Sequence, residues 1–360
     1  MSGDRNDPLQ DPRFRAPSIW QTLREGLFGS RRMLECIQVE VTSFCPGRCT
    51  YCPHTTQAGH WRSRHMESAT FARLWPLMRM SERVHLQGWG EPFMHPRFMD
   101  FARLARKAEC RVSTTSCGLR MDERLAESIV TSGIDIVAFS LTGTDETSNL
   151  SRAGVPFSRV CESIQLLQEV RKKRMGVHLE IHLAYLMLAS QIEAVTGLPE
   201  LMDKLDVHAA VVSTLDYIAA PGMENEAFWP DEADKRNRAL HLLQQAAERA
   251  ANNGRNLYFS LPAPRIEDAS IACRENATQT LYVDAEGNVA PCIYLNLPVD
   301  SDDLQARENV NRRVFGSIIQ QDPLEIWNSP SFRAFRDALN TRMPATPCRT
   351  CPKRFEHIVS

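Results

Sequence analysis

Between residues 36 and 212, short runs rich in β-branched residues alternate with longer segments of helical period. This alternation predicts right-handed βαβ units around a parallel sheet, and therefore an α/β fold. Ligands of such sheets bind at the carboxyl ends of the strands, where the βα loops meet. The expected strands are Cys36–Val41, Arg83–Leu86, Arg111–Thr114, Ile134–Leu141, Val177–Tyr185 and Val207–Val212. The helices expected between them are Ser68–Met80, Pro96–Lys107, Asp122–Ser132, Ser158–Lys173 and Ser190–Lys204.

The pattern changes after a further amphipathic helix, which ends at Asn253–Gly254. Thr280–Val283 and Val289–Cys292 flank a Gly-containing turn and predict a β-hairpin. Pro323–Thr341 predicts one more helix. We therefore expect three parts: a lead-in over residues 1–33, a larger α/β domain over 34–256, and a small domain of hairpin and helix over 257–360.

Cysteine is the unusual part of the composition, with 11 in 360 residues. The polar N-terminus lacks the pattern of a signal peptide, so we expect a cytoplasmic protein whose thiols stay reduced. No run of about 18 apolar residues predicts a membrane span. The 42 basic and 44 acidic side chains argue against broad nucleic-acid binding. The cysteine spacing therefore reflects metal binding, catalysis or chance.

Cys45, Cys49 and Cys52 directly follow the first expected strand at C-x3-C-x2-C spacing. Three thiolates do not complete a tetrahedral zinc site. They can hold three irons of a [4Fe–4S] cube and leave the fourth iron open. The alternatives are a zinc site completed by His54, or unrelated buried thiols. The position after a strand, with Tyr51 just before the last cysteine, favours the cube.

This segment resembles the signature of the radical S-adenosylmethionine (SAM) enzymes, C-x3-C-x-aromatic-C after the first strand. The resemblance implies a partial (β/α)6 TIM-like barrel over residues 34–256, with Cys45, Cys49 and Cys52 as cluster ligands and Tyr51 beside the cofactor. In that family the open iron binds the amino and carboxylate groups of SAM. An electron from the cluster then cleaves SAM to methionine and a 5′-deoxyadenosyl radical, which abstracts hydrogen from the substrate.

Other segments resemble SAM-binding motifs of the same family. Gln87–Pro92 is similar to the Gly-Gly-Glu segment that meets the SAM amino group, which implies cofactor contacts from Gly88, Gly90 and Glu91. Gly lets backbone approach a ligand closely. Ser116 lies in a segment similar to the family's Thr-Asn-Gly, with Cys117 in place of Asn.

Two segments further along resemble the remaining SAM contacts. Ser140 lies in a segment similar to the ribose-contacting Ser-Leu-Asp-Gly, with Thr142 in place of Asp. Arg152 begins an Arg-x-Gly segment, whose guanidinium clamps the SAM carboxylate as a fork in the family. The alternative for Arg152 is an ordinary surface ion pair.

Four more cysteines, Cys273, Cys292, Cys348 and Cys351, lie in the C-terminal part. Spacing alone leaves zinc and a fully liganded [4Fe–4S] cube open. Their order resembles the SPASM/twitch extension of radical SAM enzymes, which holds auxiliary clusters, and four cysteines fit one such cluster. Motifs in the same order are Gly287–Cys292, Gly316–Ile318, Leu324–Ser329 and Phe332–Arg333.

The resemblance implies that a substrate radical loses a proton and passes its electron to the auxiliary cluster. This dehydrogenase-like oxidation needs a base, for which Asp216 and Tyr217 after the sixth strand and His182 near the end of the fifth are candidates. It also implies an electron donor such as flavodoxin or ferredoxin. A small polar metabolite such as a sugar or cyclitol is the favoured substrate, and a ribosomal peptide is the alternative. From another class, the chain would be a zinc-binding interaction protein.

Overall fold

Seven parallel strands, β1 to β7, form the centre of the protein in chain order. The computed structural model describes residues 7–16, 32–218, 222–229, 231–262, 273–299, 312–341, 344, 346–349, 351–354 and 356–359. The strands are β1 (Leu34–Val39), β2 (Ser81–His85), β3 (Arg111–Ser116), β4 (Ile136–Leu141), β5 (Glu180–Met187), β6 (Ala209–Thr214) and β7 (Asn256–Pro262). All six expected strands form, with ends shifted by up to three residues.

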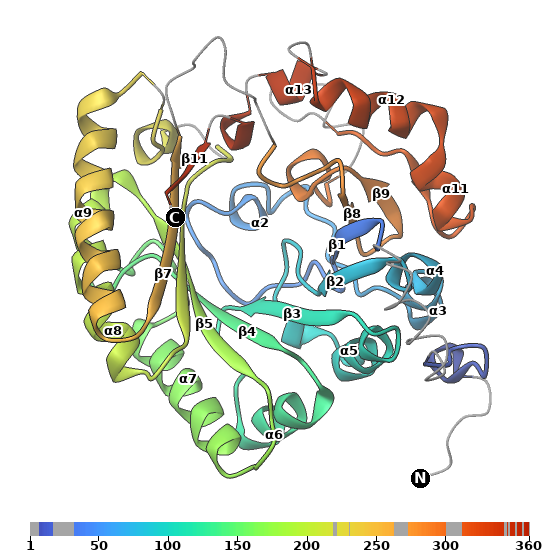
Figure 1. Ribbon diagram of the computed structural model, residues 1–360, viewed down its shortest axis with the longest axis horizontal. Helices are drawn as coiled ribbons and strands as arrows, with labels where there is room; N and C mark the ends of the chain where they lie inside the picture. The colour runs from blue at the N-terminus through green and yellow to red at the C-terminus, as the bar shows by residue number, and fades with distance from the viewer. Residues whose placement is uncertain are drawn as a thin grey trace.

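Helices cover the outer face of this curved sheet (Figure 1). They are α3 (Ser68–Ala72), α4 (Trp75–Met78), α5 (Phe98–Lys107), α6 (Glu123–Ser132), α7 (Phe157–Lys172), α8 (Leu198–Lys204) and α9 (Ala233–Asn252). The helix expected over 68–80 forms as two pieces because Pro76 cannot donate a helical hydrogen bond. Asp122 caps the first turn of α6, and Gly133 ends that helix in the left-handed region at φ 83°.

The C-terminal part joins both edges of the same sheet. β8 (Thr280–Val283) pairs in parallel with β1, and β9 (Asn288–Ala290) forms the expected hairpin with β8. β10 (Gly316–Ser317) pairs with β9 at one edge, and β11 (Glu356–Val359) pairs antiparallel with β7 at the other. The sheet therefore stays open, and the predicted partial barrel is confirmed. The expected boundary at residue 256 falls on the first residue of β7, a strand that the sequence analysis missed.

Two helices replace the single one expected over 323–341. α11 (Pro323–Asn328) ends where Ser329 caps α12 (Pro330–Leu339), because Pro330 is favoured in a first turn and not in a helix interior. Figure 1 shows α11 and α12 next to the β8–β9 hairpin. The short elements are η1 (Pro8–Gln10), α2 (Pro53–Thr56), η2 (Pro92–Met94), η3 (Ala189–Gly197), η4 (Met223–Glu226), η5 (Ile293–Leu295), α13 (Thr346–Arg349) and η6 (Pro352–Arg354).

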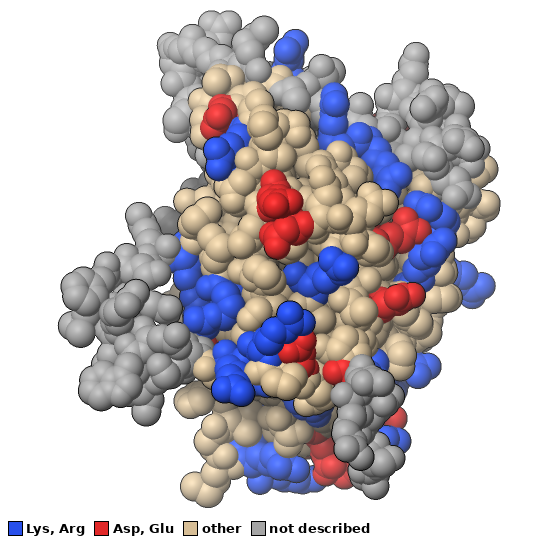
Figure 2. Space-filling model, turned by 90° about the vertical axis from the view of Figure 1, so that its right-hand side faces the viewer, with Lys and Arg blue, Asp and Glu red and all other residues tan. Residues whose placement is uncertain are grey.

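The main core lies between the sheet and the outer helices. Phe71 and Phe101 are fully buried there, with their rings stacked at 4.1 Å. None of the helices in the described ranges is long and apolar enough to cross a membrane. On the face that Figure 2 shows, basic and acidic groups are interspersed, and several lie side by side.

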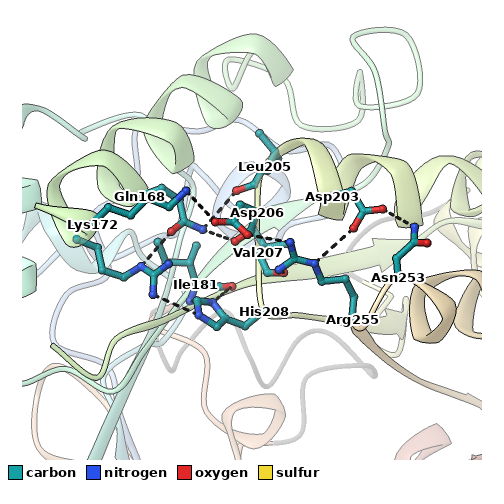
Figure 3. Close-up of polar contacts among 11 residues, drawn as sticks. Gln168, Lys172, Ile181, Asp203, Leu205, Asp206, Val207, His208, Asn253 and Arg255 are labelled. Carbon is teal, nitrogen blue, oxygen red and sulfur yellow. Dashed lines mark hydrogen bonds and ion pairs between the residues drawn. The ribbon is translucent and has the colours of Figure 1, made fainter. Parts of the chain in front are cut away.

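A polar network lies at the amino-terminal ends of β6 and β7 (Figure 3). Asp206 Oδ1 accepts from Arg255 Nη2 at 2.8 Å, and Asp206 Oδ2 pairs with Lys172 Nζ at 2.9 Å. Gln168 Nε2 donates to the Leu205 carbonyl oxygen at 3.3 Å. These contacts tie α7, the end of α8 and β7 together, and they leave the carboxyl ends of the strands to carry the site.

Candidate functional site

The first three cysteines lie in the loop between β1 and α2. A Cβ placed on Gly47 would lie 3.6 Å from Cys45 Sγ and 3.8 Å from Cys49 Sγ, so both sulfurs flank this glycine. Burial, together with the neighbouring thiols, raises the pKa of Cys45 to about 11 and that of Cys52 to about 12. The structure therefore brings the three predicted ligands together at the carboxyl end of β1.

The segment after β4 braces this loop through its backbone. Arg48 N–H donates to the Ala153 carbonyl oxygen at 2.8 Å, and Thr50 N–H donates to that of Ser151 at 2.9 Å. Ordinary residues on the loop can be replaced without losing such bonds, because only main-chain atoms take part. The cysteine loop is thus held from a segment about a hundred residues further along the chain.

Arg152 is 5% exposed and lies beside the cluster loop. Its Nη1 donates to the Tyr51 phenol oxygen at 3.1 Å. Its Nε is buried and has no hydrogen-bond partner within the described part of the chain. Burial opposes the charge, but Tyr51, Cys49 and Cys117 outweigh it and raise the pKa of Arg152. A buried cation with a spare donor fits an anionic ligand such as the SAM carboxylate.

Gly88 and Gly90 pack against the chain that leads into the cysteine loop. A Cβ on Gly90 would lie 2.2 Å from the Thr42 carbonyl oxygen, and one on Gly88 would lie 2.4 Å from Glu40 Cβ. Both positions therefore require glycine for close packing. The predicted direct contact of these glycines with SAM stays a prediction.

Glu91 and Ser116 meet at the carboxyl ends of β2 and β3. Glu91 is 1% exposed, and its Oε1 accepts from Ser116 Oγ at 2.8 Å and from Phe93 N–H at 3.2 Å. Its Oε2 accepts from Cys117 N–H at 2.6 Å. A carboxylate has about four acceptor positions, so one remains for the ammonium group of a ligand.

Ser140 is half-buried near the end of β4, level with Ala184 of β5. Thr142, which stands where the family has Asp, is fully buried and turns toward the protein. Its N–H donates to Asn149 Oδ1 at 3.0 Å. Thr142 therefore helps to fix the loop after β4, and Ser140 is left as the polar side chain at this strand end.

The four C-terminal cysteines gather around Cys292. Burial raises the pKa of Cys292, and Cys273, Cys351 and Cys348 each raise it further, which places the four thiols near one another. Within the described ranges, no three His, Cys, Asp or Glu side chains lie close enough to surround a single metal ion. The ligands of a cube lie farther apart, because each binds a different iron.

The three expected bases differ in their surroundings. Asp216 is 2% exposed at its side chain, and its Oδ2 pairs with Lys353 Nζ at 2.8 Å while its Oδ1 accepts from Thr214 Oγ1 at 2.9 Å. Burial raises the pKa of Tyr217 to about 12, and its ring packs 5.8 Å from that of Trp89. Asp216 is therefore held in a buried ion pair, and the Tyr217 phenol keeps its proton at neutral pH.

The prediction that His182 lies near the end of the fifth strand is wrong. His182 is the third residue of β5, which starts at Glu180 and ends at Met187, later than expected. Five more strand residues at about 3.3 Å each separate it from the barrel mouth. Its Nε2 lies 2.8 Å from Glu180 Oε2 instead.

Several residues near the site were not predicted from the sequence. The rings of Trp89, Tyr217 and Tyr294 lie within 6.2 Å of one another, although they come from three distant segments. Glu40, just beyond β1, is fully buried. Its alternation with Gln38 on one face of the strand is the signal that would have placed it inside the barrel.

A cavity of about 540 Å³ lies within the barrel. Its wall includes side chains of β1, β2, β3, β4 and β6, and also Tyr282 and Cys292 from the C-terminal part. One predicted ligand of the auxiliary cluster therefore lines the interior of the barrel. Glu35, Ser113 and Ile136 on this wall belong to the amino-terminal halves of β1, β3 and β4, so the cavity lies below the carboxyl ends of the strands, at the level of Glu180 of β5.

Two family models match the chain. The radical SAM superfamily model matches residues 39–185, and the SPASM model, an iron–sulfur cluster-binding domain, matches residues 273–352. Together they span more than half of the chain and include both cysteine sets.

Two relatives are similar over most of their length. The tungsten-containing aldehyde ferredoxin oxidoreductase cofactor-modifying protein of Pyrococcus furiosus is 23% identical over 317 residues, covering 84% of this chain and 83% of the relative. The PqqA peptide cyclase of Granulibacter bethesdensis is 20% identical over 326 residues, covering 88% of this chain and 79% of the relative.

Solved structures share the fold. Streptococcus suis SuiB bound to S-adenosylmethionine has a TM-score of 0.62 at 14% identity, covering 93% of this chain and 76% of that one. SuiB bound to precursor peptide SuiA has a TM-score of 0.60 at 15% identity, covering 98% and 78%. The cofactors of the present chain are SAM, a SAM-binding [4Fe–4S] cluster and an auxiliary [4Fe–4S] cluster. The chain belongs to the radical SAM superfamily and carries a C-terminal SPASM domain.

Proposed function

We propose that this radical SAM enzyme is a maturase that oxidises a side chain of a peptide. The sequence alone favoured a sugar or cyclitol, but the relatives that match both domains support the peptide alternative better. One is named a peptide cyclase, and one similar structure holds a precursor peptide. The match to an iron–sulfur cluster-binding domain also argues against the alternative of a zinc-binding interaction protein.

The barrel cavity is the observation that carries the proposal. Its volume is that of a pocket that encloses a small ligand or part of a peptide, and Cys292 lines it. Val211 on its wall is 41% exposed, and the neighbouring Tyr258 of β7 is 55% exposed. Large exposed apolar residues inside a barrel favour a ligand that brings its own apolar groups.

The residues around the cysteine loop fit the cofactors. Cys45, Cys49 and Cys52 would hold the SAM-binding cluster, with the spare Nε of Arg152 toward the SAM carboxylate and Glu91 toward its amino group. When bound, cluster and SAM supply a 5′-deoxyadenosyl radical that removes a hydrogen atom from the substrate. The auxiliary cluster would be held by Cys273, Cys292, Cys348 and Cys351.

The chain's own side chains orient the reactants and exclude water. Arg152 and Tyr51 hold each other in place at the cysteine loop. The half-buried rings of Trp89, Tyr217 and Tyr294 form an aromatic wall where the loop after β2 meets the SPASM domain. Such a wall limits quenching of a radical by solvent. A soluble one-electron donor such as flavodoxin or ferredoxin would reduce the SAM-binding cluster.

The proposal is tested by comparing two substrate classes under reducing, anaerobic conditions. Short peptides encoded beside the gene are incubated with enzyme and SAM, and a cyclitol is incubated in parallel. We expect 5′-deoxyadenosine to form together with peptides that have lost two hydrogen atoms, read by mass spectrometry. Oxidation of the cyclitol with unchanged peptides would replace this proposal with the small-metabolite reading.

A further inference from the structure

Glu40 is a buried carboxyl group that no radical SAM motif named above uses. It follows β1 directly and is fully buried. Its Oε2 accepts from Trp89 N–H at 2.8 Å, and its own N–H donates to the Val283 carbonyl oxygen at 2.8 Å. Glu40 therefore lies between the SAM-binding loop and the β8–β9 hairpin of the C-terminal part.

A second buried carboxylate, Asp284, faces Glu40 from that hairpin. Its Oδ1 accepts from the N–H groups of Glu286 and Asn288, at 2.9 and 2.8 Å. Its Oδ2 accepts from the side-chain amides of Asn288 and Asn296, both at 2.8 Å. These four donors fill the acceptor positions of the Asp284 carboxyl group. When two carboxyl groups lie close, the one with fewer donors keeps the proton.

Glu40 has fewer donors, and its charge state follows from that. Burial raises the pKa of Glu40 to about 8, Trp89 N–H opposes the shift, and the charge of Asp284 adds to it. Asp284 and Tyr282 are the titratable groups that act on Glu40. Glu40 therefore exchanges its proton close to neutral pH.

Tyr282 connects Glu40 to the cavity. It lies level with Gln38 of β1, two residues before Glu40, and both residues line the cavity wall. Glu40 Oε1 and the Tyr282 hydroxyl are both buried, and neither makes a well-formed hydrogen bond within the described residues. Each shifts the pKa of the other, so the two groups face each other across a short gap.

Cys292 is close to the same tyrosine. It lines the cavity together with Tyr282, and it is among the groups that raise the pKa of the Tyr282 hydroxyl. A substrate in the cavity would therefore meet a proton acceptor and a ligand of the auxiliary cluster on the same wall.

We propose that Tyr282 and Glu40 form a proton relay that takes up the proton lost by the substrate in the barrel cavity. This inference rests on the proposed oxidation. A two-electron oxidation takes one hydrogen atom and one electron from the substrate, for which the bound cofactors would be the acceptors, and it leaves one proton. That proton passes to the Tyr282 oxygen while the Tyr282 hydroxyl proton passes to Oε1 of Glu40 in its ionised form. Tyr282 is thus the residue that connects the cavity wall to Glu40, and Glu40 stores the proton.

The first test needs no substrate. Infrared spectra of the holoenzyme at pH 7 should show the carbonyl band of a protonated carboxylic acid, which titrates with a midpoint of about 8. The band should be absent in Glu40→Gln and unchanged in Glu286→Gln, a matched control on the turn of the same hairpin. A band that persists in Glu40→Gln, or no band in the wild type, would overturn the relay.

The second test uses the peptide that the wild type oxidises in the assay above. Glu40→Gln and Tyr282→Phe should each lower product formation by about 100-fold, while 5′-deoxyadenosine formation stays within about threefold. The wild-type rate should rise with pH to a plateau above about 8, and the Glu40→Gln profile should be flat. The double variant should be no worse than either single variant, because the two groups act in series.

The two proposals fail in different ways. Full product formation by Glu40→Gln overturns the relay and leaves the peptide oxidation standing. If the wild type oxidises no peptide, the proposed function fails. The infrared titration then still decides whether Glu40 holds an exchangeable proton. If the carboxylic acid band is absent, the relay is overturned whatever the substrate is.

Discussion

The guanidinium of Arg152 lies 3.1 Å from the phenol oxygen of Tyr51, across the base of the cysteine loop. The aromatic residue of the cluster signature and the arginine after β4 are therefore one unit. Since Arg152 Nε remains without a partner among the described residues, the pair is arranged to receive a further acceptor.

Replacing Arg152 with Lys should weaken SAM binding. Lysine keeps the charge but loses the fork that bonds Tyr51 and a carboxylate together. Loss of one charge-assisted hydrogen bond costs about 1.5–3 kcal/mol, or about 10- to 100-fold in the dissociation constant of SAM. Equilibrium dialysis with labelled SAM measures it. Arg124→Lys, on the exposed side of α6, is the control, and equal affinities in the two variants would rule out this role.

Replacing Gly90 with Ala should destabilise the protein near the cysteine loop. The added Cβ would lie 2.2 Å from the Thr42 carbonyl oxygen, so backbone has to move, at a cost of about 1–3 kcal/mol or more. Thermal unfolding and cluster content are the readouts. Gly59→Ala has no atom within 4 Å of its new Cβ and should match the wild type. Equal stability of both variants would contradict the packing described here.

Asp206→Asn should destabilise the barrel modestly. Lys172 and Arg255 lower the pKa of Asp206 to about 2, against its usual value near 4. The folded pKa lies below the unfolded one, so this stabilisation is present above about pH 4 and is lost as the pH falls to about 2. Partly exposed ion pairs contribute about 1 kcal/mol or less, and salt screens them. The difference in unfolding temperature should shrink from 0.1 to about 1 M salt, and a salt-independent difference would refute the ionic origin.

Cys348→Ala should separate the two halves of the reaction. SAM cleavage should remain measurable, because the SAM-binding loop after β1 is untouched, while net oxidation of the peptide should stop. Chromatography of 5′-deoxyadenosine beside mass spectrometry of the peptide measures both. Cys161→Ala, on α7, is the matched control. Full product turnover by Cys348→Ala would exclude an electron-accepting role for the second cysteine set.

Local sequence signals found most of the fold. Runs of β-branched residues predicted the six strands of the expected barrel, and the cysteine spacing predicted the cluster loop. The interiors of the helices were predicted correctly, but the breaks before Pro76 and Pro330 were not. The amphipathic pattern continues across each proline, so the pattern alone does not show that a helix ends there. β7 was missed because it follows a helix directly and ends in Pro262.

The surroundings of the site were less predictable than its motifs. Glu40 looks like an exposed strand residue until the β8–β9 hairpin covers it, and Asp216 looks like a free base until Lys353 pairs with it. Both partners are distant in sequence, so no local pattern encodes them. The motif residues Glu91, Ser116 and Arg152 were predicted because the family resemblance carries tertiary information that periodicity lacks, and their contacts with SAM stay a prediction.

Iron and acid-labile sulfide per chain test the assignment of the two cysteine sets most directly. Anaerobically prepared wild type should hold about eight of each, as expected for two cubes. Cys45→Ala and Cys348→Ala should each hold about four, and only Cys45→Ala should lose 5′-deoxyadenosine formation. Full iron and sulfide in both variants, or zinc without sulfide in the wild type, would contradict the assignment.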